Sequence, residues 1–297
     1  MPNVQNLPIR DPAYKDIRRA IAAPPDTGGV LLDDTFVMVE CDLSQVELRT
    51  LAQASGDPVL IDAFQRGTDL HTATARELFP EVGLIDYILR QIGKTCNFGL
   101  SYGASAGKLF EVCMTAGYPI TMGKAAAMHR ALQERYARLE EYRAEQHAVV
   151  LRTNEVHTLF GRVRMFPVIA TMRQGELAAA LREAFATIPQ GTAADLFKVW
   201  LVLIDKAGLF DHTGGVTLRR RRLVNVVHDS VVAYVPRKEA GQWAEAVCKQ
   251  ASETPYRASE VMIGLERTKW WGGVRDWQVP ILAEAKAGQN WAELEGV

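Results

Sequence analysis

Residues 35–49 of the 297-residue chain read TFVMVECDLSQVELR, and this stretch decides the fold. Its first part, Thr35–Cys41, is mostly apolar or β-branched and follows two aspartates, which predicts a buried strand that ends at Asp42. The apolar residues of 45–54 then recur at helical spacing, until Gly56-Asp57-Pro58 breaks the pattern. We therefore predict a strand and a helix, with Asp42 between them.

Helical patterns predominate in the rest of the chain. They predict helices over residues 59–65, 71–79, 89–100, 104–118, 124–150, 172–185, 193–206 and 240–253. Two alternating apolar runs, Leu223–Val227 and Ser230–Val235, flank His228-Asp229 and predict a β-hairpin. This order favours an α+β fold with a small antiparallel sheet over a doubly wound parallel sheet.

Composition limits the function classes only weakly. The 34 Lys and Arg residues balance 35 Asp and Glu residues, so the chain has no overall basic footprint for nucleic acid. Its four cysteines are widely spaced, which argues against a zinc ribbon or disulfide framework and fits a reducing cytoplasm. The longest apolar run has about six residues, so no membrane helix is expected.

Two aspartates are candidate metal ligands, because Asp42 and Asp229 each stand at the tip of a predicted strand. Carboxylates at neighbouring strand tips can share hard cations, and Mg²⁺ prefers one or two protein carboxylates together with substrate phosphates. Two such ions can clamp an in-line phosphoryl displacement. Taken singly, either aspartate is more typical of a turn residue or helix cap.

A stripe of cationic and aromatic residues follows the predicted 89–100 helix at four-residue spacing: Arg90, Lys94, Phe98 and Tyr102. Each step drifts only about 40°, so the four share one face about 18 Å long. This pattern matches a nucleoside triphosphate, with phosphates on the cations and the base on the aromatics. It also fits a solvated basic turn with buried aromatics. Glycines at 93, 99 and 103 favour the ligand, because they permit close approach.

Two further features carry less specific signals. The run Leu218–Arg222 contains four arginines that could contact nucleic-acid phosphates, although such runs are more typical of solvated or edge-blocking segments. His71 could bind phosphate, but a lone histidine is more often structural.

Together these motifs resemble DNA polymerase family A, the DNA polymerase I family. Residues 42–49 resemble its motif A, residues 90–103 its motif B and residues 226–229 its motif C. Further matches lie at residues 2–10, 69–72, 158–162, 190–195, 279–282 and 288–291. The matches run from residue 2 to about residue 291 in family order, and their combination is specific.

The resemblance implies template-directed nucleotidyl transfer from a dNTP to a primer 3′-hydroxyl. Two Mg²⁺ ions would be held by Asp42, Asp229 and the Leu43 carbonyl. The implied dNTP-binding residues are Glu47, His71, Arg90, Lys94, Phe98 and Tyr102. Among them, Lys94 is also a candidate acid for pyrophosphate, and Glu47 would exclude a 2′-hydroxyl. The implied primer–template residues are Arg10, Gln45, Arg182, Gln190 and His228.

Two positions depart from the family pattern. Ser230 stands where the family usually has Glu, as in single-subunit phage-type RNA polymerases. Glu47 and Phe98 hold the sugar-discriminating positions in the DNA-polymerase form, so we favour a DNA polymerase. Ala186 stands where the family usually has Asn, which removes one expected primer–template contact.

The resemblance further implies a palm over residues 1–55 and 172–297 and helical fingers over residues 56–171. The thumb and any 3′–5′ exonuclease domain of the family precede the matched region, so we expect them to be absent here. Either a separate polypeptide would then supply them, as in a split polymerase, or the chain is a truncated polymerase. In both cases we expect the chain alone to hold DNA weakly. The alternative is a catalytically dead DNA-binding remnant. The expected location is the cytoplasm, or the host cytoplasm for a phage protein, without membrane attachment.

Overall fold

The computed structural model describes residues 19, 36–103, 105–167, 169–211, 221–261 and 277–297. Arg10, the segment around it and residues 218–220 of the arginine run lie outside these residues. Contacts along the chain divide it into two compact units. Unit 1 comprises Met1–Val46, Leu196–Ile263 and Ile281–Val297, and unit 2 comprises Glu47–Asp195 and Gly264–Pro280.

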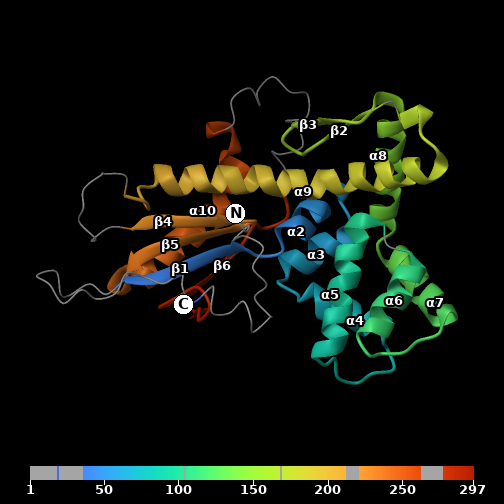
Figure 1. Ribbon diagram of the computed structural model, residues 1–297, viewed down its shortest axis with the longest axis horizontal. Helices are drawn as coiled ribbons and strands as arrows, with labels where there is room; N and C mark the ends of the chain where they lie inside the picture. The colour runs from blue at the N-terminus through green and yellow to red at the C-terminus, as the bar shows by residue number, and fades with distance from the viewer. Residues whose placement is uncertain (1–18, 20–35, 104, 168, 212–220, 262–276) are drawn as a thin grey trace, which may run out of the picture. The chain divides into compact units, whose positions relative to one another are not determined.

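Unit 1 is built on a five-stranded antiparallel sheet of order β4-β5-β1-β6-β7, which confirms the predicted fold class (Figure 1). Its strands are β1 (Phe36–Leu43), β4 (Arg222–Val227), β5 (Ser230–Pro236), β6 (Ala283–Gly288) and β7 (Glu295–Gly296). The β4–β5 hairpin turns at His228-Asp229, as the sequence predicts. Strand β6 was not predicted, because its sequence AEAKAG has little β-propensity.

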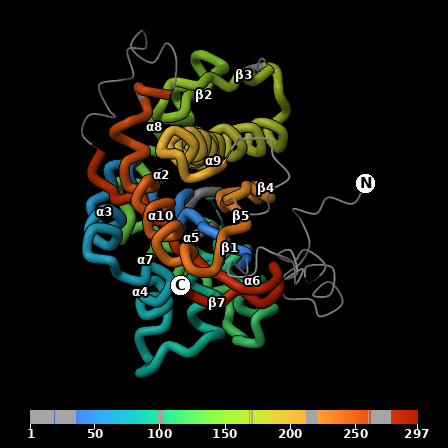
Figure 2. Tube along the Cα trace, turned by 90° about the vertical axis from the view of Figure 1, so that its left-hand side faces the viewer, coloured from blue at the N-terminus to red at the C-terminus, as the bar shows by residue number. Residues whose placement is uncertain are grey.

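Helix α10 (Ala240–Arg257) covers one face of this sheet (Figures 1 and 2). The thiol of Cys41 is hydrogen-bonded to Cys248 of α10. Strand side chains alternate between faces, so the buried residues Val39 and Cys41 face α10 while Glu40 and Asp42 face away from it. The face that carries Glu40 and Asp42 also has a small apolar cluster, which consists of Met38, Val227, Val232 and Trp291.

Unit 2 is largely helical around a large apolar cluster. Its helices are α2 (Val46–Ser55), α3 (Pro58–Gln65), α4 (Leu70–Leu78), α5 (Tyr87–Tyr102), α6 (Ala106–Thr115), α7 (Met122–Arg135) and α8 (Ala137–Thr153). A short hairpin of β2 (Glu155–His157) and β3 (Val163–Met165) follows, and α9 (Gln174–Lys206) runs from unit 2 into unit 1. Among the described residues, no helix is long and apolar enough to cross a membrane.

Two predicted helices were wrong in extent. The predicted 124–150 helix is divided at the buried Tyr136, and α8 begins with the Leu139 amide donating to the remote Asp57 carboxylate at 3.2 Å. The predicted break between 185 and 193 is absent, because α9 continues through Pro189. The Thr50 hydroxyl of α2 lies 3.0 Å from the Pro189 carbonyl, so α2 contacts α9 at the residue where a helix is most easily interrupted.

Gly93 determines how closely α4 and α5 can pack. A Cβ atom at this position would lie 2.2 Å from the His71 carbonyl oxygen and 3.0 Å from the Ala75 amide nitrogen. Both are backbone atoms that cannot rotate away. The absence of a side chain at Gly93 therefore allows helix α4 to approach α5 closely.

Gly93→Ala should therefore destabilise the protein by about 3 kcal/mol, as overpacking does in tight interiors. Urea unfolding of the full chain measures this loss. The matched control is Gly175→Ala in α9, where an added Cβ meets nothing within 4 Å and alanine should be neutral or slightly stabilising. Equal unfolding midpoints for the two variants would contradict the packing argument.

Candidate active site

The first cluster of candidate site residues lies in unit 1, at the end of β1. The β1–β5 register pairs Asp42 with Ser230, which puts the neighbouring Asp229 beside the strand end. The Leu43 amide donates to the Asp229 carbonyl at 3.0 Å and fixes the turn against β1. The two carboxyl groups are hydrogen-bonded to each other. The structure thus brings together the two aspartates that the sequence singles out.

The electrostatics of this pair are those of two carboxyls that share a proton. Loss of hydration among protein atoms, together with the charges of Asp229 and Glu40, raises the pKa of Asp42 to about 7, although its side chain is exposed. Loss of hydration also raises the pKa of Asp229. Two carboxyls in contact cannot both ionise readily, so a proton or a cation is needed between them.

Backbone conformation beside both aspartates is unusual. Gln45 and His228 have φ angles of 53° and 54°, in the left-handed region that residues other than glycine seldom adopt. The Gln45 side-chain oxygen is buried and, within the described ranges, accepts no hydrogen bond. Such strain is concentrated at functional sites, where surrounding structure holds it in place.

The donor set of this cluster fits magnesium bound together with a substrate. Within the described part of the chain, no three His, Cys, Asp or Glu side chains converge as a metal cage. Mg²⁺ does not require one, because it takes one or two carboxylates and completes its shell with water and phosphates. A pair of hydrogen-bonded carboxyls with raised pKa values supplies the ligands of that arrangement.

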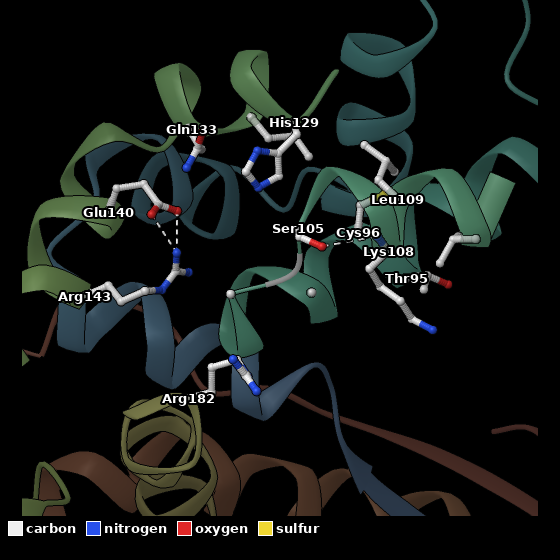
Figure 3. A pocket seen from close by; sticks show the side chains of 14 residues that line it. Thr95, Cys96, Ser105, Lys108, Leu109, His129, Gln133, Glu140, Arg143 and Arg182 are labelled. Atoms are coloured by element: carbon white, nitrogen blue, oxygen red, sulfur yellow. Dashed lines mark hydrogen bonds and ion pairs between the residues drawn. The ribbon is translucent and has the colours of Figure 1, made fainter. Parts of the chain in front are cut away.

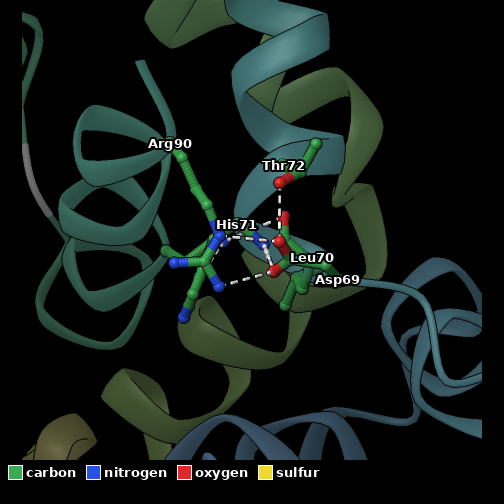
Figure 4. Close-up of polar contacts among 6 residues, drawn as sticks. Asp69, Leu70, His71, Thr72 and Arg90 are labelled. Atoms are coloured by element: carbon green, nitrogen blue, oxygen red, sulfur yellow. Dashed lines mark hydrogen bonds and ion pairs between the residues drawn. The ribbon is translucent and has the colours of Figure 1, made fainter. Parts of the chain in front are cut away.

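The second cluster lies in unit 2, where α4 packs on α5 (Figure 4). Asp69 caps α4 and accepts two hydrogen bonds from the Arg90 guanidinium, at 2.7 and 3.2 Å, and one from Thr72 at 2.6 Å. Partial burial would raise the pKa of Asp69, but the bonds from Arg90 and Thr72 outweigh it and lower the pKa to about 2. Arg90 is thus held in place by a permanent carboxylate.

His71 in the same cluster is neutral with a defined tautomer. The Asn97 side-chain nitrogen donates to the Leu70 carbonyl at 3.2 Å and lies 3.0 Å from His71 Nδ1. An amide nitrogen only donates, so Nδ1 accepts and the imidazole proton is on Nε2. Burial, aided by the charges of Arg90 and Lys94 and opposed by Asp69, lowers the pKa of His71 to about 4.

The remaining predicted site residues have varied surroundings. Glu47 is half-buried in the first turn of α2, while Arg182 and Gln190 are exposed on α9 and His228 is exposed at the hairpin tip. Ala186 is buried. The side chains of Phe98 and Tyr102 lie outside the described part of α5, so their predicted roles are untested.

Unit 2 also contains a pocket of about 730 Å³ beside α5 (Figure 3). Helices α5 to α9 line it, and its lining includes Gly99, Gly103 and the predicted primer–template residue Arg182. Arg143 in its wall is held by two contacts with Glu140. Sequence reasoning missed this pocket, because its residues come from five separate helices.

An ion pair between an exposed arginine and a buried aspartate also escaped sequence reasoning. Asp195, 1% exposed, accepts from Thr158 and from Arg162, each at 2.8 Å, and Arg162 also donates to the Gly191 carbonyl at 2.8 Å. These bonds join the β2–β3 hairpin loop to α9. The motif matches at 158–162 and 190–195 contained the signal, since all four residues belong to them.

A mixed fold with paired carboxylates on an antiparallel sheet is the arrangement expected of a metal-dependent nucleotidyltransferase. The model of DNA polymerase family A matches residues 1–293. The chain therefore belongs to DNA polymerase family A.

Individual relatives agree with this assignment. The thermostable DNA polymerase I of Thermus thermophilus is 33% identical over 293 residues, which cover 98% of this chain and 30% of that protein. DNA polymerase I of Chloroflexus aurantiacus is 33% identical over 99% of this chain and 27% of its own length. The chain thus spans less than a third of the length of these relatives.

A solved structure shares the fold. It is the polymerase domain of Pol1 from M. smegmatis, in complex with DNA primer–template and dNTP. It aligns with a TM-score of 0.74 at 26% identity and covers 98% of this chain and 45% of that one.

The low pKa of His71 predicts how stability depends on pH. The unfolded chain binds a proton on this group below its ordinary value of 6.5, whereas the folded chain binds it only near pH 4. The free energy of unfolding should therefore fall by roughly 1–3 kcal/mol through this group as pH drops from 6.5 to 4. In His71→Gln, this part of the pH dependence should be missing.

Urea unfolding at pH 7.5, 6, 5 and 4.5 checks this, with His129→Gln, a histidine of the pocket wall, as the matched variant. If the free energy of unfolding falls equally with pH in the wild type and in His71→Gln, the pKa of His71 is not lowered in the folded chain.

Proposed function

We propose that the chain carries out template-directed DNA synthesis, by nucleotidyl transfer from a dNTP to a primer 3′-hydroxyl. The observation that carries this proposal is the hydrogen-bonded pair Asp42 and Asp229, at adjacent strand ends of a family A polymerase fold. The neighbouring structure supports it, since that polymerase domain was solved with primer–template and dNTP.

In this proposal, Asp42, Asp229 and the Leu43 carbonyl hold two Mg²⁺ ions. Ions at such a site lower the pKa of the attacking hydroxyl and neutralise charge on the triphosphate. The contribution of the protein is to hold two carboxylates in contact despite their repulsion. The strand register and the Leu43–Asp229 backbone bond support that geometry.

The α4–α5 cluster supplies the proposed triphosphate contacts. Arg90 and Lys94 bring positive charge, and the Nε2–H of neutral His71 is a donor for a phosphate oxygen. Because Asp69 already holds Arg90, the guanidinium is oriented before a nucleotide binds. Lys94 is also the proposed acid that protonates the pyrophosphate leaving group.

The proposed roles of the other residues follow the family pattern. Glu47 excludes a 2′-hydroxyl, and Phe98 and Tyr102 contact the incoming nucleotide and templating base. The proposed contacts to primer and template are made by Arg10, Gln45, Arg182, Gln190 and His228. We retain the names palm for residues 1–55 and 172–297 and fingers for residues 56–171 as part of this proposal.

Primer extension with Mg²⁺ and dNTPs tests the proposal. Asp42→Asn and Asp229→Asn should each lower the rate by about 1,000-fold, which corresponds to the loss of about 4 kcal/mol of transition-state stabilisation. Glu245→Gln, an exposed carboxylate of α10, is the matched control and should extend like the wild type.

The assay is run alone and with the remaining length of a relative added in trans, because this chain spans about 30% of such proteins. Extension that survives both Asp substitutions would exclude the proposed site. DNA binding without extension in every arm would instead support the dead DNA-binding remnant.

Sugar selection gives a separate test. Glu47→Ala should raise the use of rNTPs relative to dNTPs by about 100-fold, since a steric and electrostatic block of about 3 kcal/mol would be lost. The ratio of kcat/KM for the two nucleotides measures this change. A wild-type preference for rNTPs would favour the RNA-polymerase alternative that Ser230 raises.

A further inference from the structure

Glu40 is a third carboxylate on the face of the sheet that carries the acidic pair. It precedes Asp42 by two residues on β1, so both side chains project from the same face, about 7 Å apart along the strand. On β5, Ser230 lies opposite Asp42 and Val232 opposite Glu40. Glu40 therefore lies between the acidic pair and the apolar cluster around Met38.

Two hydrogen bonds hold the Glu40 carboxylate in one place. The Trp291 indole nitrogen donates to Glu40 Oε1 at 3.2 Å. The Ser230 hydroxyl lies 3.3 Å from the same oxygen and 3.1 Å from the Val227 carbonyl, so it shares its one proton between these two acceptors. Both donors are 3% exposed. A half-buried carboxylate gripped by two buried donors has little freedom, so its charge has a fixed position relative to the acidic pair.

The charges on this sheet face define what Glu40 contributes. On β6, Glu284 lies opposite Asp42 and accepts from Ser44 at 3.1 Å, and Lys286 lies opposite Glu40. The negative charge of Glu40 acts on the acidic pair because Glu40 precedes Asp42 by two residues on the same face of β1. Its repulsion raises the free energy of the two aspartates without a cation, and its attraction lowers the free energy of the same site with a cation bound.

We propose that Glu40 is a positioning residue for divalent cations at the Asp42–Asp229 pair. Ser230 and Trp291 hold its carboxylate in place beside that pair. Within the described residues no third carboxylate converges on the pair as a ligand, so Glu40 acts at longer range. The inference rests on the proposed function, because it concerns the same cation site. It assigns Ser230 a role as an anchor of Glu40.

The test measures Mn²⁺ binding to the full chain by electron paramagnetic resonance, without DNA or nucleotide. Glu40→Gln keeps the hydrogen-bond acceptor and removes the charge, so it should weaken Mn²⁺ affinity about tenfold, as loss of an outer-sphere partner does. Ser230→Ala keeps the charge of Glu40 and removes one of its hydrogen-bond donors, so Mn²⁺ affinity should fall about threefold. Without metal, Glu40→Gln should melt at the wild-type temperature or slightly above it, because the substitution removes a repulsive charge.

Primer extension adds a second readout. Glu40→Gln should raise the Mg²⁺ concentration for half-maximal rate about tenfold, while the rate at saturating Mg²⁺ stays within about twofold of the wild type. A purely structural role would instead lower the melting temperature and the maximal rate together.

The controls distinguish the possible failures. Glu245→Gln removes the same charge from α10 on the opposite face of the sheet and should leave Mn²⁺ affinity unchanged. An equal loss in this control, or wild-type affinity in Glu40→Gln while Asp42→Asn loses binding, would overturn the inference alone. Wild-type affinity in Asp42→Asn would overturn the proposed cation site itself.

Discussion

The antiparallel pairing of β1 with β5 is the constraint on which the proposed active site depends. A one-residue slip would turn Asp42 toward the α10 face and bring Cys41 to the opposite one. The register is secured on both faces, by the buried Val39 and Cys41 against α10 and by Met38 against its apolar cluster. Packing far from the carboxylates therefore determines where they stand.

This register forces like charges together. Asp229 and Glu40 raise the cost of ionising Asp42, and Glu40 also raises that of Asp229, which opposes folding in the absence of a cation. The sheet tolerates the repulsion because β1 pairs on both edges, with β5 and with β6. A central strand with two partners is a suitable place for such a pair, since neither neighbour can separate easily.

The sequence predicts those strands and helices that depend on residues close together in the chain. The β1 strand, the His228-Asp229 hairpin and helix α5 could all be read from the sequence. What the sequence could not reveal depends on remote partners. Asp57 caps α8 from 82 residues away, and Thr50 contacts α9 at Pro189. Glu40 carries no local signal, because its partners Ser230 and Trp291 are 190 and 251 residues away in the chain.

The α4–α5 cluster, which is the proposed triphosphate site, is organised differently from the acidic pair. There, close packing prearranges the cations: Gly93 lets α5 approach the backbone of α4, and Asn97 on the same helix then bonds both Leu70 and His71. Asp69 orients Arg90 across the same contact. A larger residue at 93 would separate the helices and loosen all three bonds together. Helix packing thus determines the geometry of the proposed triphosphate site, as strand register determines that of the cation site.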